Sequence, residues 1–550
     1  MQATRGGVDL EVDVAVVGAG AAGLYTALCA AREGARVALV SAAPLAQTAS
    51  YWAQGGLAAA LAEDDSPELH LRDTERAGRG AMRASAAEVL VREAPACVED
   101  LQALGVRFDA DRFGRLALGL EGGHSVRRVV HAGGSATGRR LLRTLSALAV
   151  AERRIAVLEN VRARALWPRE GASPAGRSPT PMHERQPPTA RTAAERAWVR
   201  CGGLICEDGR TIAARAVVLS TGGAAALWAR TTNPPGSQGV GLLLAHALGA
   251  QLADLELVQF HPTAVKGVRG REGFLVTEAI RGEGATLHDA AGERFVDELA
   301  PRDEVSRAIW TRMHATGADH VGLDMRAIDP ALFPNVVGAL REAGVDPTRE
   351  LVPVAPAAHY TMGGIVTDLH GRSSVAGLYA VGETSCTGLH GANRLASNSL
   401  SECFVWGRRA AHSALQEPAS ARVGMWAPRE PAGASGGGTL ASKEPAGAGS
   451  GGVSAGGLAT LAGLDSPPVA SAATREALWR DAGIERSAEG LARLAHDPHP
   501  LARLIAACAL ERRESRGAHR RVEHPEPDPA LDGHHIVVDA AGGLTWETWT

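Results

Sequence analysis

The sequence predicts an α/β protein whose first domain is built on a parallel sheet. Two observations predict this class. First, a β-rich run from Val12 to Val17 meets a glycine cluster, an Ala- and Leu-rich helical pattern follows, and a second apolar strand runs from Val37 to Val40. Strand, helix and strand in this order form a βαβ unit, whose strands are parallel. Second, the later run "ARAVVLSTGGAAAL" is again a buried strand that ends in glycines, Gly222 and Gly223.

Size and composition limit the number of domains, the kinds of partner and the location that we expect. The chain has 550 residues, 45% of them hydrophobic, which supports two to four domains. A net charge of −4 gives no basic face, so we expect no nucleic-acid partner. The first eleven residues carry no signal pattern, and no apolar run is long enough to cross a bilayer, so a cytoplasmic protein without a membrane partner is expected.

The cysteines are scattered and form no CxxC pair, so neither zinc nor an iron–sulfur cluster is indicated, and we predict no metal site. Their spacing fits reduced thiols. They are Cys29, Cys97, Cys201, Cys206, Cys386, Cys403 and Cys508.

Two low-complexity segments divide the chain. The segment from Trp167 to Arg196 is rich in Pro, Ser, Thr and Arg, and predicts a long surface insertion. The segment from Glu417 to about Ala470 is rich in Gly, Ala, Ser and Pro, and predicts a flexible linker. After it, "REALWRDAGIERSAEGLARLA" and "PLARLIAACALERRESRGAHRR" have helical periodicity, which predicts a small helical C-terminal domain.

The glycine cluster "GAGAAG" has the spacing of a dinucleotide-binding turn, with glycines at Gly18, Gly20 and Gly23. The first permits a tight turn, the second lets the backbone approach a pyrophosphate, and the third lets helix and strand pack closely. The helix that follows presents free N–H groups to the phosphates. A close-packed turn without a ligand is the alternative, but the position after a strand and before a helix favours a dinucleotide.

The residues at the end of the second strand do not identify the cofactor. An acidic residue there would hold the adenosine ribose, but this chain has Ser41 and Ala42. Turn and strand alone therefore do not choose between FAD and NAD.

Several charged and polar residues suit a small dianion. Each could be structural when taken alone, but together they supply two arginines, two histidines and a hydroxyl beside acids and an amide. The candidates are Glu121, Gln259, His261, Thr277, Arg302, His359, Glu383 and Arg394. The fork of an arginine such as Arg394 suits a carboxylate, and hydride removal from carbon needs a flavin or nicotinamide beside that anion.

These motifs resemble the succinate dehydrogenase/fumarate reductase flavoprotein superfamily. "QFHPT", "TEAIRGEGA", "LAPRD", "HYTMGG" and "HGANRLASNSL" occur in one order, and the match runs from about Val12 to Gly407 and resumes from Glu511 to His519. The membrane-complex enzymes link FAD covalently to a histidine four residues before the alanine of "AQGG"; here that position is Ala49. The resemblance therefore implies FAD bound non-covalently.

Within this superfamily, the chain is most similar to members that oxidise L-aspartate. "EGGHSVRRVVHA" and "RLASNSLSE" are similar to the versions in those members, and Glu121 lies where they carry a glutamate facing the ammonium group. The resemblance implies oxidation of L-aspartate to iminoaspartate, with O2 (giving hydrogen peroxide) or fumarate as acceptor. It implies the first step of NAD biosynthesis through quinolinate, with the quinolinate-forming enzyme as a candidate partner.

The resemblance also implies a fold and domain boundaries. A doubly wound, Rossmann-like FAD-binding domain is expected over residues 1–252 and 353–418. An α+β capping domain, residues 253–352, is inserted between the two stretches. A flexible linker over 419–470 and the helical domain over 471–550 follow.

By resemblance, each site residue receives a role. Arg394 with His359, and His261 with Thr277, each hold one substrate carboxylate. Gln259 is a further substrate-binding residue, Glu121 orients the amine, and Arg302 is the catalytic, proton-transferring residue. The residues expected to bind FAD are Gly18, Ala19, Gly20, Ala21, Ala22, Gly23, Ser41, Ala42, Ser50, Gln54, Gly55, Gly56, Glu383, Ser399 and Leu400. A helix beginning near Ser399 would direct its positive end at the flavin.

Two other functions fit part of the pattern. A soluble fumarate reductase or succinate dehydrogenase subunit is favoured by Met362, whereas Glu121 and Ala49 oppose it. A non-catalytic FAD-binding protein that acts through its C-terminal helices is supported by the long linker and by Val240 and Ser135, which replace the usual aspartates of two motifs.

Overall fold

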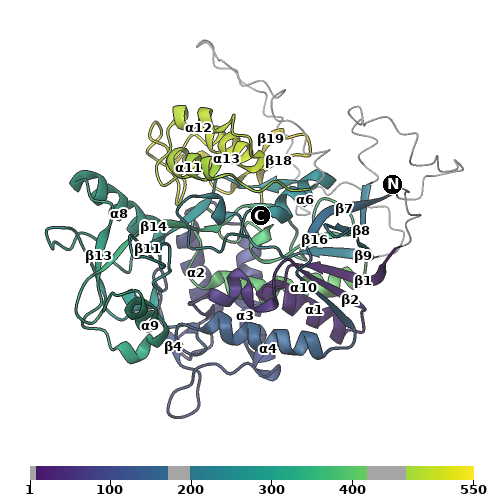
Figure 1. Cartoon of the computed structure of the whole chain (residues 1–550), viewed down its shortest axis with the longest axis horizontal. Coiled ribbons are helices and arrows are strands. Elements are labelled where there is room, and N and C mark those ends of the chain that lie inside the picture. Colours follow the sequence, from purple (N-terminus) through teal and green to yellow (C-terminus); the bar gives the residue numbers. More distant parts are fainter. Residues whose placement is uncertain (1–7, 171–198, 418–465) are drawn as a thin grey trace, which may run out of the picture.

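The structure is a computed structural model that describes residues 8–170, 199–417 and 466–550. Figure 1 shows three parts: a sheet with helices below it, a lobe at the left that contains β11 and β14, and the C-terminal residues at the top. Within the described ranges, no helix is both long and apolar enough to span a bilayer.

The main sheet confirms the predicted α/β class. It has seven strands in the order β6-β2-β1-β9-β8-β7, with β16 also paired to β9. Its strands are β1 (Leu10–Val17), β2 (Val37–Ser41), β6 (Ile155–Glu159), β7 (Ala163–Glu170), β8 (Val199–Cys206), β9 (Thr211–Leu219) and β16 (Leu378–Ala380). The pairs that join β1, β2, β6, β9 and β16 are parallel, whereas β7 and β8 run antiparallel to their neighbours.

Strand β1 alternates between two hydrophobic cores. Val14 and Val16 pack in one core, and Ala15 and Val17 in the other, because successive side chains of a strand point to opposite faces. The first core is covered by α1 (Ala21–Arg32), α3 (Ala84–Ala103), α4 (Thr137–Ala151) and α10 (Asn398–Leu415). The second is covered by α6 (Val240–Leu248) and by α11 (Ala472–Asp481), α12 (Ala488–Leu494) and α13 (Pro500–Glu511). Both faces of the sheet are therefore buried.

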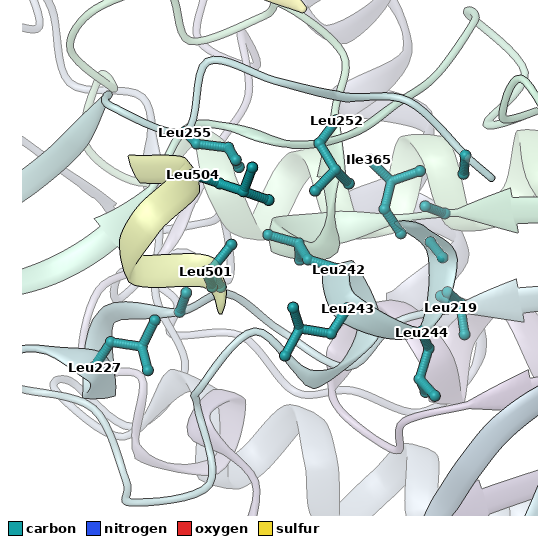
Figure 2. Close-up of a cluster of buried hydrophobic side chains, with 14 of the residues drawn as sticks. Leu219, Leu227, Leu242, Leu243, Leu244, Leu252, Leu255, Ile365, Leu501 and Leu504 are labelled. Carbon is teal, nitrogen blue, oxygen red and sulfur yellow. The ribbon is translucent and has the colours of Figure 1, made fainter. Parts of the chain in front are cut away.

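The C-terminal helices are part of the second core. Figure 2 shows Leu501 and Leu504 of α13 among the leucines of α6 and beside Leu255. The indole of Trp228 donates a hydrogen bond of 2.9 Å to the carbonyl of Ala482. These contacts fix the C-terminal residues against the rest of the chain.

The inserted lobe contains a four-stranded antiparallel sheet in the order β11-β14-β13-β12. Its elements are β11 (Val258–Val265), α7 (Ala279–Gly282), β12 (Thr286–His288), α8 (Arg302–Thr316), β13 (Val321–Asp324), α9 (Pro334–Glu342) and β14 (Val352–Thr361). β14 pairs with both β11 and β13, so this sheet continues beyond residue 352, where the predicted capping domain ends. The boundary is not visible in the sequence because it depends on strand pairing.

The prediction that the C-terminal domain is helical is wrong for its last residues. Strands β18 (His534–Val538) and β19 (Leu544–Thr548) form a hairpin. Ile536, Val537 and Val538 are β-branched, which favours a strand. The hairpin extends a sheet in the order β17-β15-β10-β18-β19. Its other strands are β10 (Leu252–Ala253), β15 (Gly364–Val366) and β17 (Ser385–Cys386).

Three short strands form a separate small sheet. β3 (Leu57–Ala58), β5 (Val129–Val130) and β4 (Leu118–Gly119) form a three-stranded antiparallel sheet. α2 (Pro67–Gly78) packs beside α3. This small sheet brings Glu121 and its loop toward the N-terminal end of α10, as described below.

The two low-complexity predictions are only partly covered by the described residues. Trp167–Glu170 belong to β7, because they pair with β8, so the insertion predicted from Trp167 begins later. Residues 171–198 and 418–465 lie outside the described residues. At the end of the predicted linker, the backbone N–H of Ala470 donates to the side chain of Gln238 at 2.9 Å.

Candidate active site

One large cavity brings most of the predicted site residues together. Its volume is about 1190 Å³, and it lies between the main sheet and the inserted lobe. Its wall contains Gly18, Ala19, Gly20, Ala21, Ala22, Ser41, Ala42, Ser50, Gln54, Gly55, Gly56, Glu121, His261, Thr277, Arg302, His359, Glu383, Arg394, Ser399 and Leu400. Gly23 and Gln259 are not part of this wall.

The glycine turn is shaped for close backbone approach. Gly18 has φ +110°, and a Cβ there would lie 2.2 Å from the carbonyl oxygen of Ser220. A Cβ on Gly23 would lie 1.9 Å from the carbonyl oxygen of Gly18, so Gly23 serves the packing of α1 on β1, as its place in the motif predicts. Gly20 is the N-cap of α1 and offers no side-chain cap, which leaves N–H groups for a ligand. Ser50 Oγ accepts one of them, from Ala21, at 3.2 Å.

Two polar groups flank this turn. Ser41 donates its hydroxyl proton to the carbonyl of Ala43 at 2.6 Å, so toward the cavity it can act as an acceptor. Glu383 accepts the backbone N–H of Thr361 at 2.9 Å. Burial raises the pKa of Glu383 to about 7, although Thr361 favours the charged form. A buried carboxyl that is half-titrated near neutral pH suits a ligand hydroxyl as a partner.

The N-terminal end of α10 is a second group of backbone donors. Ser397, its N-cap, has φ +61°, a left-handed conformation that is costly for a residue with a Cβ. No side chain caps the helix; the amide of Asn398 donates to the carbonyl of Leu395 at 3.3 Å, and the next two residues, Ser399 and Leu400, line the cavity. The positive end of a helix macrodipole therefore faces this space. Together, the glycine turn, Glu383 and this helix end fit a dinucleotide with an electron-accepting ring.

Gln259 joins the two arginines of the site. Its Oε1 accepts from Arg302 NH1 at 3.0 Å and from Arg394 Nε and NH2, each at 3.3 Å. Its Nε2 donates to the carbonyl of Arg394 at 2.8 Å. Gln259, which was predicted to bind the substrate, is not part of the cavity wall and contacts both guanidinium groups.

Arg394 remains a cation in a dry environment. Burial, followed by the charge of Arg302, lowers its pKa to about 10. Its guanidinium carbon lies 4.3 Å from the ring centroid of Tyr360, whose hydroxyl donates to Glu402 at 3.1 Å. Its NH1 donates to Ser399 Oγ. Tyr360 was not predicted, although it stands next to His359 in the "HYTMGG" motif.

Two neutral histidines face the arginines. The ring centroids of His261 on β11 and His359 on β14 are 5.0 Å apart. Burial, with nearby arginines adding to it, lowers the pKa of both well below the ordinary value. His261 Nδ1 accepts the backbone N–H of Thr263 at 3.3 Å, which leaves an Nε2–H donor. His359 Nδ1 lies 2.7 Å from the hydroxyl of Thr232.

A β-bulge directs His359. Gln259 pairs with Tyr360 and Phe260 pairs with Ala358, so His359 is an extra residue on β14. Bulges of this kind often redirect a side chain beside an active site. The amide of Asn233 also holds the carbonyl of His359 at 2.6 Å. The bulge is not visible in the sequence, because it depends on pairing with a distant strand.

A buried chain of charges leads away from Arg302. Arg302 Nε donates to Glu278 Oε2 at 2.6 Å, and Arg281 NH2 lies 3.0 Å from Glu278 Oε1. All three side chains are buried. Glu278 and Arg281 belong to the same motif as Thr277, but sequence reasoning gave them no role.

Glu121 is a buried carboxylate on the opposite side of the site. Ser397 donates its hydroxyl to Glu121 Oε2 at 2.6 Å, and His131 Nε2 lies 3.5 Å from Oε1. Burial favours the neutral acid, but His131, Ser397 and Arg302 together outweigh it and lower the pKa of Glu121 to about 2. Glu121 is therefore a fixed negative charge in the cavity wall.

The departures from the usual motifs fall in different places. Val240, at the first position of α6, lines the cavity. Ser135 is buried and is not part of the cavity wall.

Comparison with known proteins identifies the class and then the family. The family model described as FAD binding domain matches residues 13–400, and the model described as fumarate reductase flavoprotein C-term matches residues 495–545. A quinol fumarate reductase of E. coli has a similar structure, with a TM-score of 0.76, 27% identity and coverage of 98% of this chain and 96% of the other. A quinol–fumarate reductase with menaquinol has a TM-score of 0.78, 28% identity and coverage of 98% of both chains. Fold and site thus define a flavoprotein of the succinate dehydrogenase/fumarate reductase type, with FAD as its cofactor.

Sequence relatives narrow this class. The L-aspartate oxidase of Streptomyces coelicolor is 40% identical over 98% of this chain and 93% of its own length. That of Caulobacter vibrioides is 42% identical over 95% of this chain and 96% of its own length. The chain belongs to the L-aspartate oxidase family.

Proposed function

We propose that this chain oxidises L-aspartate to iminoaspartate, with O2 or fumarate as the final electron acceptor. The observation that carries the proposal is Glu121, a buried carboxylate in the same cavity wall as Arg302 and Arg394. Two cations suit two carboxylates, and a fixed anion suits an ammonium group. L-aspartate has these three charges, whereas succinate has no group that would need Glu121.

The dicarboxylate is held by a mixture of charged and neutral donors. Arg394 with His359 binds one carboxylate, and His261 with Thr277 binds the other. The two histidines are neutral, so they donate hydrogen bonds without adding charge, and the arginines balance the anion. Gln259 fixes the separation of Arg302 and Arg394, which positions the substrate carbon before reaction.

The chain Arg302–Glu278–Arg281 supports proton movement. A hydrogen bond of 2.6 Å joins Arg302 to Glu278, and an ion pair of 3.0 Å joins Glu278 to Arg281. In fumarate reduction, Arg302 delivers a proton to the substrate carbon and is reprotonated through Glu278. In aspartate oxidation, the C2 hydrogen would leave as a hydride for the bound cofactor and one ammonium proton would pass to water, while the arginines keep both carboxylates ionised.

The cofactor is held by the backbone turn from Gly18 to Ala22, by Ser50 and by Glu383 on its ribose. FAD, when bound, supplies the acceptor for the hydride from C2. The N-terminal end of α10, at Ser399 and Leu400, stabilises negative charge that develops beside it. We propose that FAD is not covalently attached, because Ala49 has no nucleophilic side chain. After acid precipitation the flavin should stay in the supernatant; flavin that remains with the protein pellet would contradict this.

The proposal extends to the pathway and the compartment in which the reaction takes place. The iminoaspartate formed is the substrate for quinolinate formation in NAD biosynthesis, and the quinolinate-forming enzyme is its proposed partner. All seven cysteines lie in the described residues and are free thiols, which supports a reducing compartment such as the cytoplasm.

The test is anaerobic reduction of the purified, flavin-loaded protein. L-aspartate should bleach the visible flavin band, and addition of fumarate or air should restore it. Succinate at the same concentration serves as the comparison. Bleaching by succinate with no response to L-aspartate would identify a succinate dehydrogenase instead, and no bleaching by either would favour a non-catalytic FAD-binding protein.

A further inference from the structure

A cluster of ion pairs joins the inserted lobe to α2, directly beside Arg302. Arg302 is the first residue of α8, and Asp303 and Glu304 follow it in the same turn. Arg79 donates through Nε and NH2 to the two carboxylate oxygens of Asp303, each at 3.1 Å, and also to Glu304 Oε1. The side chain of Asp303 is only 1% exposed. A bidentate pair with a buried carboxylate fixes orientation as well as distance.

The backbone of Arg79 has an unfavourable conformation. Arg79 is the C-cap of α2 and has φ +56° and ψ +39°, in the left-handed region. Glycine is the usual residue at a helix end of this conformation, because a Cβ is costly there. The carbonyl of Arg79 accepts a hydrogen bond of 2.6 Å from Arg516 NH1, which supports the conformation. An arginine at a position that favours glycine indicates that its side chain has a function.

The first turn of α8 brings Arg302 to the cavity wall. Its guanidinium donates to Glu278 at 2.6 Å and to Gln259 at 3.0 Å, and both partners belong to the inserted lobe. These bonds fix the guanidinium within the lobe. Arg79 instead binds the next residue, Asp303, from α2, which lies outside the lobe (Figure 1). Arg79 therefore fixes the start of α8 relative to another part of the chain.

α2 is itself fixed to the first turn of α10. Asn398 is the first residue of α10, and its side chain donates to Thr74 Oγ1 at 3.1 Å. His70 Nε2 lies 2.8 Å from Asn398 Oδ1. The next two residues of α10 line the cavity at the end that fits the cofactor. α2 thus connects this helix end to Arg79, and Arg79 connects it to the turn that carries Arg302.

We propose that Arg79 is a positioning residue that holds the first turn of α8, and with it Arg302, at a fixed place relative to the N-terminal end of α10. The inference rests on the proposed function, in which Arg302 gives a proton to the carbon of fumarate. Without Arg79, the buried carboxylate of Asp303 loses its bidentate partner and this turn shifts. Proton transfer needs contact at hydrogen-bond distance, so a small shift slows it.

The two reactions should respond differently. Fumarate reduction takes a proton from Arg302, whereas aspartate oxidation takes none. Displacing Arg302 should therefore lower kcat for fumarate far more than kcat for aspartate. KM should change less, because the residues proposed to hold the carboxylates lie on elements other than α8. A purely structural role for Arg79 would reduce flavin content or lower both activities together.

The experiment measures kcat and KM per bound flavin, for aspartate oxidation with O2 and for fumarate reduction with a reduced viologen dye as electron donor. In Arg79→Gln, kcat for fumarate should fall about ten- to a hundredfold, whereas kcat for aspartate and both KM values should change less than about threefold. The ratio of kcat for fumarate in H2O to that in D2O should rise, because proton delivery becomes slower. Arg79→Lys keeps the charge without the fork, so its kcat for fumarate should lie between those of Arg79→Gln and the wild type.

Arg520 provides the matched control. Burial and the charge of Arg307 lower the pKa of Arg520. Asp303 and Glu304 oppose that shift, so Arg520 lies near the same two acids. Its Nε has no hydrogen-bond partner within the described residues. Arg520→Gln therefore removes a nearby cation without breaking the bidentate pair, and its kcat for fumarate should stay within about twofold of the wild type.

A double-mutant cycle tests whether Arg79 acts through Asp303. Asp303→Asn alone should lower kcat for fumarate as Arg79→Gln does, and the double variant should be no slower than the slower single variant. A wild-type kcat for fumarate in Arg79→Gln, equal losses for both substrates, or an equal loss in Arg520→Gln would overturn the inference while leaving the proposed function intact. A wild type that is inactive with both substrates would overturn both. If Arg79→Gln lowers flavin content, Arg79→Lys and Asp303→Asn are measured by the same criteria.

Discussion

The wall near Gly18 and the wall near Arg394 belong to one cavity but are made of different parts of the protein. At the cofactor end, main-chain amides and close-packed glycines shape the surface, and the turn from Gly18 to Ala22 is one continuous stretch of it. At the substrate end, buried charged side chains from strands and loops far apart in sequence meet through Gln259. The cofactor end therefore depends on local backbone conformation, whereas the substrate end depends on how the inserted lobe is placed.

The largest expected effect comes from the substrate end. Arg394→Leu leaves a bound carboxylate without its buried partner, which costs on the order of 3–5 kcal/mol, or a factor of roughly 150 to 4,000 in kcat/KM. The loss should be similar for aspartate and fumarate, and flavin content should be unchanged. Steady-state kinetics with both substrates check this. Arg326→Leu removes an exposed pair with Asp324 and is the control; an Arg394→Leu enzyme within tenfold of the wild type would show that another group binds the carboxylate.

At the cofactor end, a single methyl group should be enough to remove FAD. Gly18→Ala places a Cβ 2.2 Å from the Ser220 carbonyl at φ +110°. Backbone strain and atomic overlap together should lower the free energy of unfolding by about 2–4 kcal/mol. The ratio of flavin to protein absorbance and the Tm should both fall. Gly34→Ala is the matched control, since Gly34 has φ +94° with no atom within 4 Å of its Cβ position. Retention of flavin by Gly18→Ala would mean that the turn can open.

Glu121→Gln, at the substrate end of the cavity, should affect aspartate oxidation and fumarate reduction differently. Removing the carboxylate that we propose binds the ammonium group should reduce kcat/KM for aspartate by about 10- to 100-fold, the value of a hydrogen bond between charged groups. Fumarate reduction should be unchanged or faster, because a repulsive charge is gone. Equal losses for both substrates would make Glu121 structural and would remove the main argument for aspartate over succinate.

The smallest effect on turnover is expected for a change outside both ends of the cavity. The sequence predicts that Pro418 to Ala470 builds no core, but Ala470 contacts Gln238, and residues 466–469 line the cavity. We therefore expect that replacing only residues 418–465 by a Gly/Ser spacer of equal length changes turnover by less than about twofold. A replacement that keeps its flavin but loses turnover would show a further role for this segment.

The same contrast explains what the sequence could predict. The turn at Gly18 was identified because its geometry is encoded within six neighbouring residues. The substrate residues were predicted from short motifs, but their mutual contacts were not: the hydrogen bonds by which Gln259 joins two arginines have no signal in the sequence. The bulge at His359 and the pairing of β18 with β10 each depend on strands distant in sequence, so no local pattern could show them.

Ser397 has a consequence for how this protein can evolve. At φ +61°, a glycine would have about 1 kcal/mol less conformational strain than the serine. Glycine, however, would take away the hydroxyl that holds Glu121 Oε2 and accepts the N–H of Gly56 at 3.1 Å. Because the loss of these two buried hydrogen bonds costs more than the strain that glycine would relieve, selection for stability and selection for growth that needs the amine-bearing substrate should both preserve the serine. The two pressures therefore act in the same direction at this one position.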